Sequence, residues 1–280
     1  MEIMERVRQR RSVRTFEQRA VDQGSREKLR QLLRECAAGP FGTPLRLELL
    51  ELDPVNPREL KSFGTYGTIQ GAGLYLIGAV KDIAGSQVDL GYCLEKVVLE
   101  VTALGLGSCW LGGTFRRSRF ARRIKLADDE LLPVVIPLGY PAESEKLWDH
   151  LIRSGSRSSR RKPWCELFFT EDGRTPLSEK DAGSYRNALE AVRLAPSALN
   201  RQPWRIIRDR EGRYRLYLKE ERLFNRALGK IRLQHVDIGI AMSHFELAAR
   251  EQALPGRWDP HAGAVPLAGL EHMALWDSSR

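Results

Sequence analysis

One loop in the second half of the chain carries small neutral polar side chains at close spacing. Ser197, Asn200 and Gln202 place a hydroxyl and two amides within six residues. Such groups donate and accept hydrogen bonds, so the set suits a polar heterocycle with alternating N–H and C=O groups, such as the pyrimidine end of a flavin. An ordinary loop between a helix and a strand would explain the same residues without any ligand.

A dense basic segment near the N-terminus has the composition of an anion site. Residues 10–14 read Arg-Arg-Ser-Val-Arg, which places three arginines and a hydroxyl within five residues. Guanidinium groups match phosphate oxygens through paired hydrogen bonds. The alternative is a solvated basic patch.

A glycine-rich segment, residues 105–113, reads Gly-Leu-Gly-Ser-Cys-Trp-Leu-Gly-Gly. Gly105 or Gly107 would end the preceding helix in left-handed geometry. Gly112 and Gly113 would let backbone N–H groups approach a flat ligand closely. The alternative is a plain helix stop. No dinucleotide-binding fingerprint is present, because Gly71 and its neighbours precede a strand rather than follow one.

Helices and strands must position these three segments. Periodicity predicts helices over 2–10, 25–36, 87–104, 118–126, 185–194 and 236–253, and strands over 45–52, 74–80, 131–140, 204–208, 213–219 and 270–276. We expect Ser25 to cap the second helix. Pro196 ends the helix before the polar loop, because its ring blocks helix continuation.

The order of these elements repeats along the chain. Val88-Asp89-Leu90-Gly91 opens one long helix, and Val236-Asp237-Ile238-Gly239 opens another. Pro44-Leu45-Arg46 likewise stands where Pro203-Trp204-Arg205 stands. We infer a single domain, 1–280, built from two intertwined repeats at about 1–162 and 163–280, with divergent loops.

The three segments resemble signatures of the nitroreductase family of flavin mononucleotide (FMN) enzymes. Residues 195–204 resemble A-P-S-x-x-N-x-Q-P-W, residues 10–14 resemble R-R-S-x-R, and residues 105–112 resemble G-L-G-x-x-W-x-G. The resemblance implies an α+β fold with antiparallel or mixed sheets flanked by helices.

The resemblance also implies which residues bind FMN. The arginine segment would hold the phosphate and ribityl chain, the glycine segment would lie over the ring, and the polar loop would meet the ring edge. The Gly112 backbone N–H is the candidate donor to flavin N5. Arg161 resembles a family residue that reaches back to the phosphate, although Arg160 could serve instead. The expected cofactor-binding residues are Arg10, Arg11, Ser12, Arg14, Trp110, Leu111, Gly112, Gly113, Arg161, Pro196, Ser197, Ala198 and Asn200.

Nitroreductases work as homodimers in which one subunit supplies the arginine and glycine segments and the other supplies the polar loop. Here the first half of the chain contains the arginine and glycine segments, and the second half contains the polar loop. The chain therefore resembles a fused pseudo-dimer with one complete site. We therefore expect a monomer.

The implied reaction passes a hydride from NAD(P)H, as co-substrate, through FMN to a nitroaromatic, quinone or similar conjugated acceptor. No catalytic side chain is expected, because FMN carries the chemistry. The alternative is a protein that binds or sequesters flavin without efficient reductase activity.

Composition limits the other classes of function. Apolar residues make up 42% and charged residues 29% of 280 residues, as in globular proteins. A net charge of +9 permits nucleic-acid or membrane binding but equally suits a phosphorylated cofactor. The basic stretch 153–162 reads as an exposed linker without a known nucleic-acid motif, so neither partner is expected.

The N-terminus lacks a signal-peptide core, and no run reaches transmembrane length. The four cysteines lack metal-ligand spacing, which fits reduced thiols, three of them buried, and a cytoplasmic location.

Overall fold

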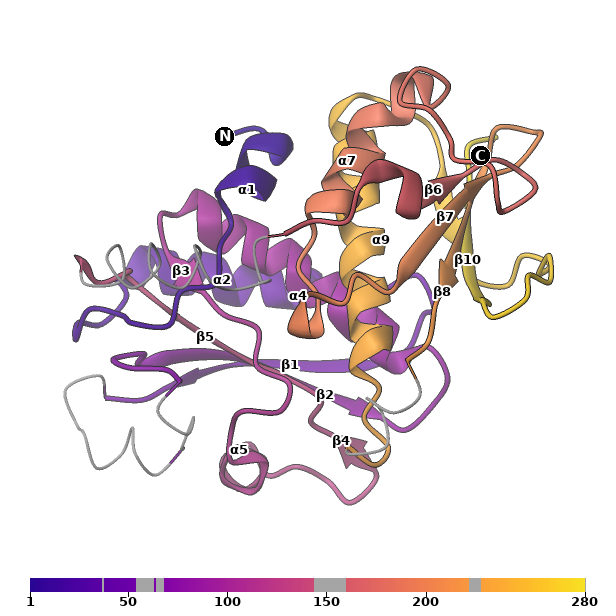
Figure 1. Cartoon of the computed structure of the whole chain (residues 1–280). Helices are drawn as coiled ribbons and strands as arrows, with labels where there is room; N and C mark the ends of the chain where they lie inside the picture. Colours follow the sequence, from indigo (N-terminus) through magenta and orange to yellow (C-terminus); the bar gives the residue numbers. More distant parts are fainter. Residues whose placement is uncertain (37, 54–62, 64–67, 144–159, 222–227, 280) are drawn as a thin grey trace.

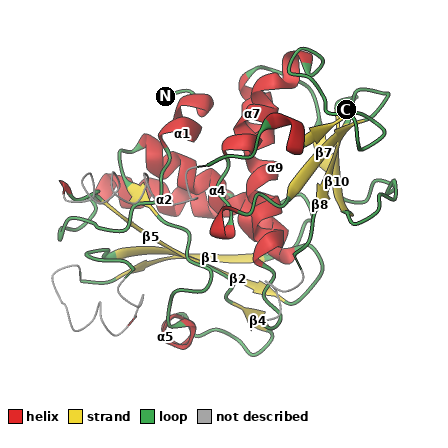
Figure 2. Cartoon of the chain, in the orientation of Figure 1, coloured by secondary structure: helices red, strands yellow, loops and turns green. Residues whose placement is uncertain are grey.

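Two sheets enclose a layer of helices in this computed structural model, which describes residues 1–36, 38–53, 63, 68–143, 160–221 and 228–279 (Figure 1). Figure 1 shows the long helices α4 (Ser86–Ala103) and α9 (Leu233–Glu251) crossing at the centre. The strands of the first half lie on one side of this pair and those of the second half on the other (Figure 2).

The first sheet has the strand order β1-β2-β5-β3, with β4 also pairing to β2, and every described pair is antiparallel. Its strands are β1 (Leu45–Glu51), β2 (Leu74–Lys81), β3 (Gly107–Ser108), β4 (Glu130–Leu131) and β5 (Val135–Gly139). Strand β2 is buried at every position except its last residue. This apolar run fits a central strand that is covered on both faces.

The second sheet repeats this order as β7-β8-β10-β9 and adds β6 at the outer edge of β7. Its strands are β6 (Phe168–Phe169), β7 (Trp204–Arg208), β8 (Tyr214–Leu218), β9 (Arg257–Asp259) and β10 (Glu271–Asp277). The β6–β7 pair is parallel, whereas the others are antiparallel. The repeated topology confirms the predicted α+β fold with two pseudo-symmetric halves.

The helices follow the same repetition, since α2 packs on α4 and α7 packs on α9. Within the described residues, the other helices are α1 (Ile3–Gln9), α2 (Gln23–Glu35), α5 (Arg117–Arg123) and α7 (Arg186–Leu194), with short 3-10 turns η2 (Trp164–Glu166), η3 (Gly183–Tyr185) and η4 (Ala198–Asn200). Figure 1 shows α1 beside the end of α4 and near α7, so the N-terminal segment lies across both halves.

Two glycines at equivalent positions allow α4 and α9 to cross at close range. A β-carbon on Gly91 would lie 2.1 Å from the backbone oxygen of Val236, and one on Gly239 would lie 1.9 Å from that of Val88. Real β-carbons do not approach backbone oxygens this closely. Glycine is therefore required at both positions by the helix contact itself.

Several local expectations are corrected by the structure. Asp22, not Ser25, caps α2, and its carboxylate accepts a hydrogen bond from the Ser25 backbone N–H. The strand expected over 131–140 is interrupted between β4 and β5, where Pro133 lacks a backbone N–H for the ladder. The first part of the expected linker, 153–159, lies outside the described residues.

Burial also differs from expectation at two places. Arg160 is exposed as expected of a linker, but Arg161 and Lys162 are half-buried. Two of the cysteines, Cys93 and Cys109, are buried rather than three. The division of the chain at about residue 162 stays a prediction.

Candidate functional site

The arginine segment lies directly against the glycine-rich segment, as predicted for parts of one site. Ser12 forms a parallel bridge with Ser108 of β3, and the Val13 backbone N–H donates to the Ser108 carbonyl at 2.8 Å. A β-carbon on Gly107 would meet the Val13 side chain at 2.7 Å. Gly107 is thus required by this packing, whereas Gly105, with a φ of 72°, provides the left-handed end of α4.

Arg10 presents a guanidinium with unused hydrogen bonds inside the protein. Its Nε and Nη1 atoms are buried and have no hydrogen-bond partner among the described residues. Burial lowers the pKa of Arg10, and the nearby Glu95 and Cys109 partly oppose that effect. A buried donor without a partner costs free energy, so the site fits an anion that would accept from Arg10.

A buried carboxylate on α4 connects the glycine-rich segment to the second half. Glu95 accepts from the indole N–H of Trp110 at 2.9 Å, and its other oxygen lies 2.8 Å from Nε2 of His244. Both partners of the Glu95–His244 pair are fully buried. Nδ1 of His244 carries a hydrogen, because it faces the carbonyl of Ala191 at 2.9 Å. Trp110 is therefore anchored toward the helix layer.

The polar loop has a strained backbone. Leu199, Asn200 and Gln202 have φ values of 48°, 55° and 49°, a region that non-glycine residues rarely occupy. Strained residues are found preferentially at functional sites. Leu199 is also 73% exposed, which is unusual for a large apolar side chain. The loop is thus held in a conformation that its residues would not adopt on their own.

Hydrogen bonds to the basic segment at 160–162 hold this conformation. The Lys162 backbone N–H donates to Gln202 at 2.8 Å, and the Asn200 amide donates to the Arg160 carbonyl at 2.6 Å. Within the loop, the Gln202 backbone N–H donates to the Ser197 hydroxyl at 2.9 Å. The polar side chains predicted to meet a ligand therefore also hold the loop together.

Arg161 binds the polar loop and lies near Arg10 of the arginine segment. It donates from Nη1 to the Asn200 side-chain oxygen at 3.0 Å and from Nε to the Leu194 carbonyl at 3.1 Å. Burial, and then the positive charge of Arg10, lower its pKa to about 10. Two guanidinium groups from different halves thus lie close enough to repel each other, which again fits an anion between them.

An open groove of about 440 Å³ lies where the basic segment meets the polar loop. It is lined by Arg160, Arg161, Lys162, Leu199, Asn200, Arg201, Gln202 and Glu221. Three predicted residues, Arg161, Ser197 and Asn200, belong to this groove or to the hydrogen bonds behind it. Arg11 and Arg14 are half-buried farther along the arginine segment, where the Arg14 carbonyl accepts from the Gln70 backbone N–H at 2.8 Å.

Equivalent aspartates on the two central helices hold the equivalent loops of the two halves. Asp237 on α9 accepts from the Ala198 backbone N–H at 2.9 Å, and its second oxygen is buried without a partner among the described residues. Asp89 on α4 uses both oxygens, accepting from the backbone of Phe41 and from the backbone and hydroxyl of Thr43. The loop of the first half is therefore more tightly closed.

The glycine pair meets the second half at α9. A β-carbon on Gly112 would lie 2.6 Å from the side chain of Leu233, whereas one on Gly113 would meet nothing within 4 Å. Leu111 forms a bridge with Val135 of β5. Packing against Leu233 therefore explains why residue 112 is glycine. Of the two glycines, Gly113 is the one with open space beside it for another group.

Arg117 fixes the glycine pair and was missed by the sequence analysis. It donates from Nη2 to the Gly112 carbonyl at 2.7 Å and from Nε to the Leu132 carbonyl at 2.8 Å. Burial lowers its pKa. The sequence contains no signal for this role, because Arg117 directly precedes the helix expected over 118–126 and is one of several arginines in this segment.

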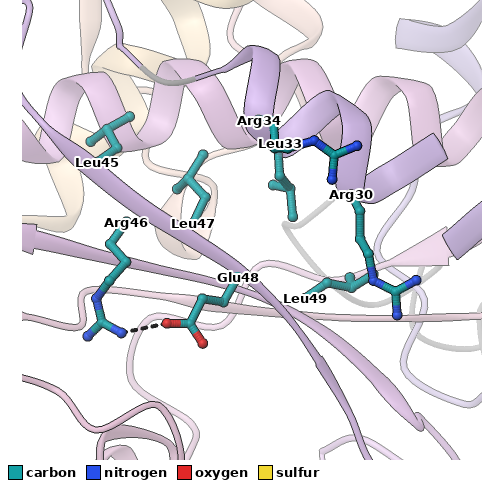
Figure 3. Close-up of a pocket in the computed structure, with 8 residues that line it drawn as sticks. All are labelled: Arg30, Leu33, Arg34, Leu45, Arg46, Leu47, Glu48 and Leu49. Atoms are coloured by element: carbon teal, nitrogen blue, oxygen red, sulfur yellow. Dashed lines mark hydrogen bonds and ion pairs between the residues drawn. The ribbon is translucent and has the colours of Figure 1, made fainter. Parts of the chain in front are cut away.

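A second groove lies outside the predicted site, between α2 and β1 (Figure 3). Its volume is about 510 Å³, and it is lined by Arg30, Leu33, Arg34, Leu45, Arg46, Leu47, Glu48 and Leu49. Figure 3 shows the ion pair of Arg46 with Glu48, and Arg46 also pairs with Glu130 at 2.6 Å. None of the predicted site residues lines this groove.

The described part of the chain offers neither a metal centre nor a membrane-spanning element. No group of three or more potential metal ligands comes together among those residues. No helix that the structure describes is both long and apolar enough to cross a membrane.

One antiparallel and one mixed sheet around a crossed helix pair, with basic residues of both halves near each other, define a nitroreductase-like fold. The chain belongs to the nitroreductase family described as "Putative TM nitroreductase", whose model matches residues 2–249. No curated protein matches the chain.

Among the solved structures that the chain resembles, the first one below shows the same fold. A "putative nitroreductase" from Thermotoga maritima MSB8 is 22% identical, with a TM-score of 0.62 over 99% of this chain and 93% of that chain. A nitroreductase family protein from Clostridium difficile 630 is 21% identical and covers 51% of this chain and 86% of its own, with a TM-score of 0.43. An FMN-dependent nitroreductase from Clostridium difficile R20291 is 15% identical over 49% and 87% of the two chains, with a TM-score of 0.39.

Proposed function

We propose that this protein is an FMN-dependent oxidoreductase that uses NAD(P)H to reduce a nitroaromatic, a quinone or a similar conjugated acceptor. The observation that supports it most directly is Arg10, whose buried Nε and Nη1 atoms lack partners among the described residues. Arg161 of the other half lies close enough for its pKa to be lowered by Arg10. A phosphate between them would accept hydrogen bonds from Arg10 and reduce the repulsion between the two guanidinium groups.

The residues divide into those for the phosphate and those for the ring. Arg10 and Arg161 would hold the phosphate, with Arg11, Ser12 and Arg14 along the ribityl chain. The polar loop, from Pro196 through Ser197 and Ala198 to Asn200, would meet the ring edge. Trp110 and Leu111 would support the ring from the glycine-rich segment.

The glycine pair would supply a backbone donor to the ring. Arg117 holds the Gly112 carbonyl, so it fixes the plane of the peptide between Gly112 and Gly113. Because the carbonyl and N–H of a trans peptide point in opposite directions, the Gly113 N–H of this peptide points away from Arg117. The Gly112 N–H belongs to the preceding peptide and remains our candidate donor to flavin N5.

When bound, FMN would supply the chemistry by accepting a hydride from NAD(P)H and passing the electrons to the acceptor. The chain itself would bind the FMN, orient its ring and shield it. The half-buried polar loop and the partly buried Trp110–Glu95 hydrogen bond would keep their groups fixed, which favours a preorganised site. The groove beside Leu199 would be the entrance for co-substrate and acceptor in turn.

An absorbance spectrum and an anaerobic titration test the proposed function. We expect the purified protein to be yellow, to release FMN on denaturation, and to lose its flavin absorbance when NADH or NADPH is added without oxygen. A protein that binds FMN but is not bleached by either nucleotide would instead be the flavin-binding or sequestering protein. A colourless protein that fails to bind added FMN would overturn the proposal.

A further inference from the structure

The two sheets differ at one edge, although their strand orders correspond. In the second sheet, β6 pairs in parallel with the outer edge of β7, with Phe168 opposite Ile206. In the first sheet, β1 is the equivalent of β7, and no described strand pairs with its outer edge. Burial follows this difference, because the first four residues of β7 are buried whereas every residue of β1 is half-buried. The first sheet therefore has an open edge where the second sheet is covered.

The backbone of β1 turns hydrogen-bonding groups toward this open edge. The Leu52 N–H donates to the Gly73 carbonyl at 2.7 Å, and the same register continues along β1 and β2. Because hydrogen bonding alternates along an antiparallel pair, the backbone groups of Leu45, Leu47 and Leu49 face away from β2. These three leucines also line the groove between α2 and β1. Backbone groups at the edge of a sheet are a template for pairing with another chain.

The covered edge in the second half shows how a segment would pair with β1. Leu47 corresponds to Ile206, since residues 44–46 align with residues 203–205. The Ile206 N–H donates to the Leu167 carbonyl at 2.9 Å. By the same geometry, the Leu47 N–H would donate to a carbonyl of a segment that runs parallel to β1.

The charged side chains of the groove favour an acidic segment. Arg30, Arg34 and Arg46 line the groove together with Glu48. Arg30 and Arg46 already pair with carboxylates, whereas Arg34 is exposed and forms no ion pair within the described part of the chain. In Figure 3, Arg30 and Arg34 extend from α2 on one side of the groove, and the leucines of β1 lie on the other.

The segment that covers β7 has the composition that this groove would select. Residues 166–172 read Glu-Leu-Phe-Phe-Thr-Glu-Asp, so acidic residues flank an apolar centre. Leu167 and Phe168 are buried, whereas the three acidic residues of the segment are exposed. An acidic peptide with an apolar centre therefore fits the edge of a sheet in this fold.

We propose that the groove between α2 and β1 binds an acidic peptide segment of a partner protein, which extends the first sheet as a parallel strand. Apolar side chains of the segment pack between α2 and the leucines of β1, and its acidic residues lie next to Arg34. A second copy of the chain, added edge to edge, would instead bring its own arginines toward Arg30 and Arg34, and like charges oppose that pairing. The groove contains none of the residues assigned to FMN, so this proposal is independent of the proposed function.

Titration of the full-length protein with a labelled synthetic peptide of residues 166–172 tests this proposal by fluorescence anisotropy. We expect saturable binding that weakens as the salt concentration rises. Amide exchange should slow at Leu45, Leu47 and Leu49 when the peptide is bound. A control peptide with lysine at the three acidic positions should bind about tenfold more weakly. Absence of binding, or slower exchange only outside β1, would overturn the proposal.

Variants of the groove identify the residues that hold the peptide. Arg34→Glu should weaken binding about three- to tenfold. The matched control is Arg8→Glu, which makes the same charge change in the last turn of α1 and should bind like the wild type. Leu47→Pro removes an N–H that β2 does not use, and an edge strand tolerates proline, so this variant should fold and bind about tenfold more weakly.

Two outcomes would assign the groove differently. Equal affinity of the wild type and Arg34→Glu would place the peptide elsewhere, and this comparison holds even if Leu47→Pro does not fold. Light scattering that shows a dimer of the free protein, converted to monomers by Leu47→Pro, would assign the edge of β1 to a second copy. Either result would overturn the proposal.

Discussion

Arg10 and Arg161 illustrate at the scale of single residues how the two halves depend on each other. Each is basic, each is at least partly buried, and the two come from segments about 150 residues apart in the sequence. Burying two like charges together costs free energy unless an anion compensates. Their position therefore favours a phosphate ligand more strongly than the arginine content of either segment.

Replacing Arg10 tests that assignment directly. Arg10→Met removes the charge and its donors while keeping an apolar side chain. We expect FMN affinity to fall about ten- to 150-fold, since a hydrogen bond to a charged group contributes about 1.5–3 kcal/mol. Riboflavin, which lacks the phosphate, should lose little affinity. Flavin titration followed by fluorescence measures both ligands.

The control for this measurement is Arg8→Met, on the exposed face of α1 two residues away. It removes the same charge from the molecule but not from the site, so FMN affinity should change little. An equal loss of FMN affinity in both variants would assign the effect to net charge. An equal loss for riboflavin and FMN in Arg10→Met would place the phosphate elsewhere.

Asp237 predicts a dependence of stability on pH. Burial raises its pKa to about 8, although the hydrogen bond from Ala198 opposes the rise. The folded protein therefore keeps a proton that the unfolded chain releases near pH 4. Stability should fall as pH rises from about 4 to about 8 and then level off. Asp237→Asn retains an acceptor for Ala198 and does not titrate, so its melting temperature should lack this decline.

Asp89 provides the matched comparison for that experiment. Both of its oxygens accept hydrogen bonds, so in Asp89→Asn an amide N–H would face another donor. We expect that variant to be destabilised by about 1–3 kcal/mol at neutral pH, unlike Asp237→Asn. Thermal melts at several pH values compare both. Similar behaviour of the two variants would contradict the different environments of the aspartates.

At the scale of elements, the sequence predicts what repeats along the chain and misses what depends on distant contacts. The apolar periodicity of α4 and α9 located both helices within three residues at each end. The cap of α2 was misassigned, because Asp22 and Ser25 are both common caps and only the observed bond chooses between them. The role of Arg117 depends on where β5 and the glycine pair meet, which no local pattern records.

The crossing of α4 and α9 is the element-scale feature that a single methyl group should disturb. In Gly239→Ala, the new β-carbon would lie 1.9 Å from the Val88 carbonyl oxygen, so the helices must separate. Alanine favours a helix by about 1 kcal/mol over glycine, but overpacking costs about 1–3 kcal/mol or more. We expect a net loss of stability in urea denaturation.

Gly263→Ala serves as the control for the crossing, because a β-carbon there would meet nothing within 4 Å and its φ is not positive. That variant should unfold at the same urea concentration as the wild type. If Gly239→Ala were as stable as this control, the two helices would have room to adjust, and the crossing would not limit the fold.

At the scale of the whole molecule, the two halves share the strand order of their sheets but differ in their loops. The first half retains the arginine and glycine-rich segments, and the second half retains the strained polar loop. The loop of the first half, at residues 39–43, has no counterpart of Asn200 and is closed onto Asp89. Each half thus supplies what the other lacks, and a monomer would suffice to assemble the site.

This division predicts one FMN per chain rather than two. A second site would need an arginine segment in the second half and an open polar loop in the first. The sequence shows no such arginine segment, and Asp89 fixes the loop through three hydrogen bonds. Flavin released on denaturation, quantified against protein, should give a ratio near one, and gel filtration should give the mass of one chain. A ratio near two would mean that the halves are functionally equivalent, because residues other than the recognised segments would then have to bind the second flavin.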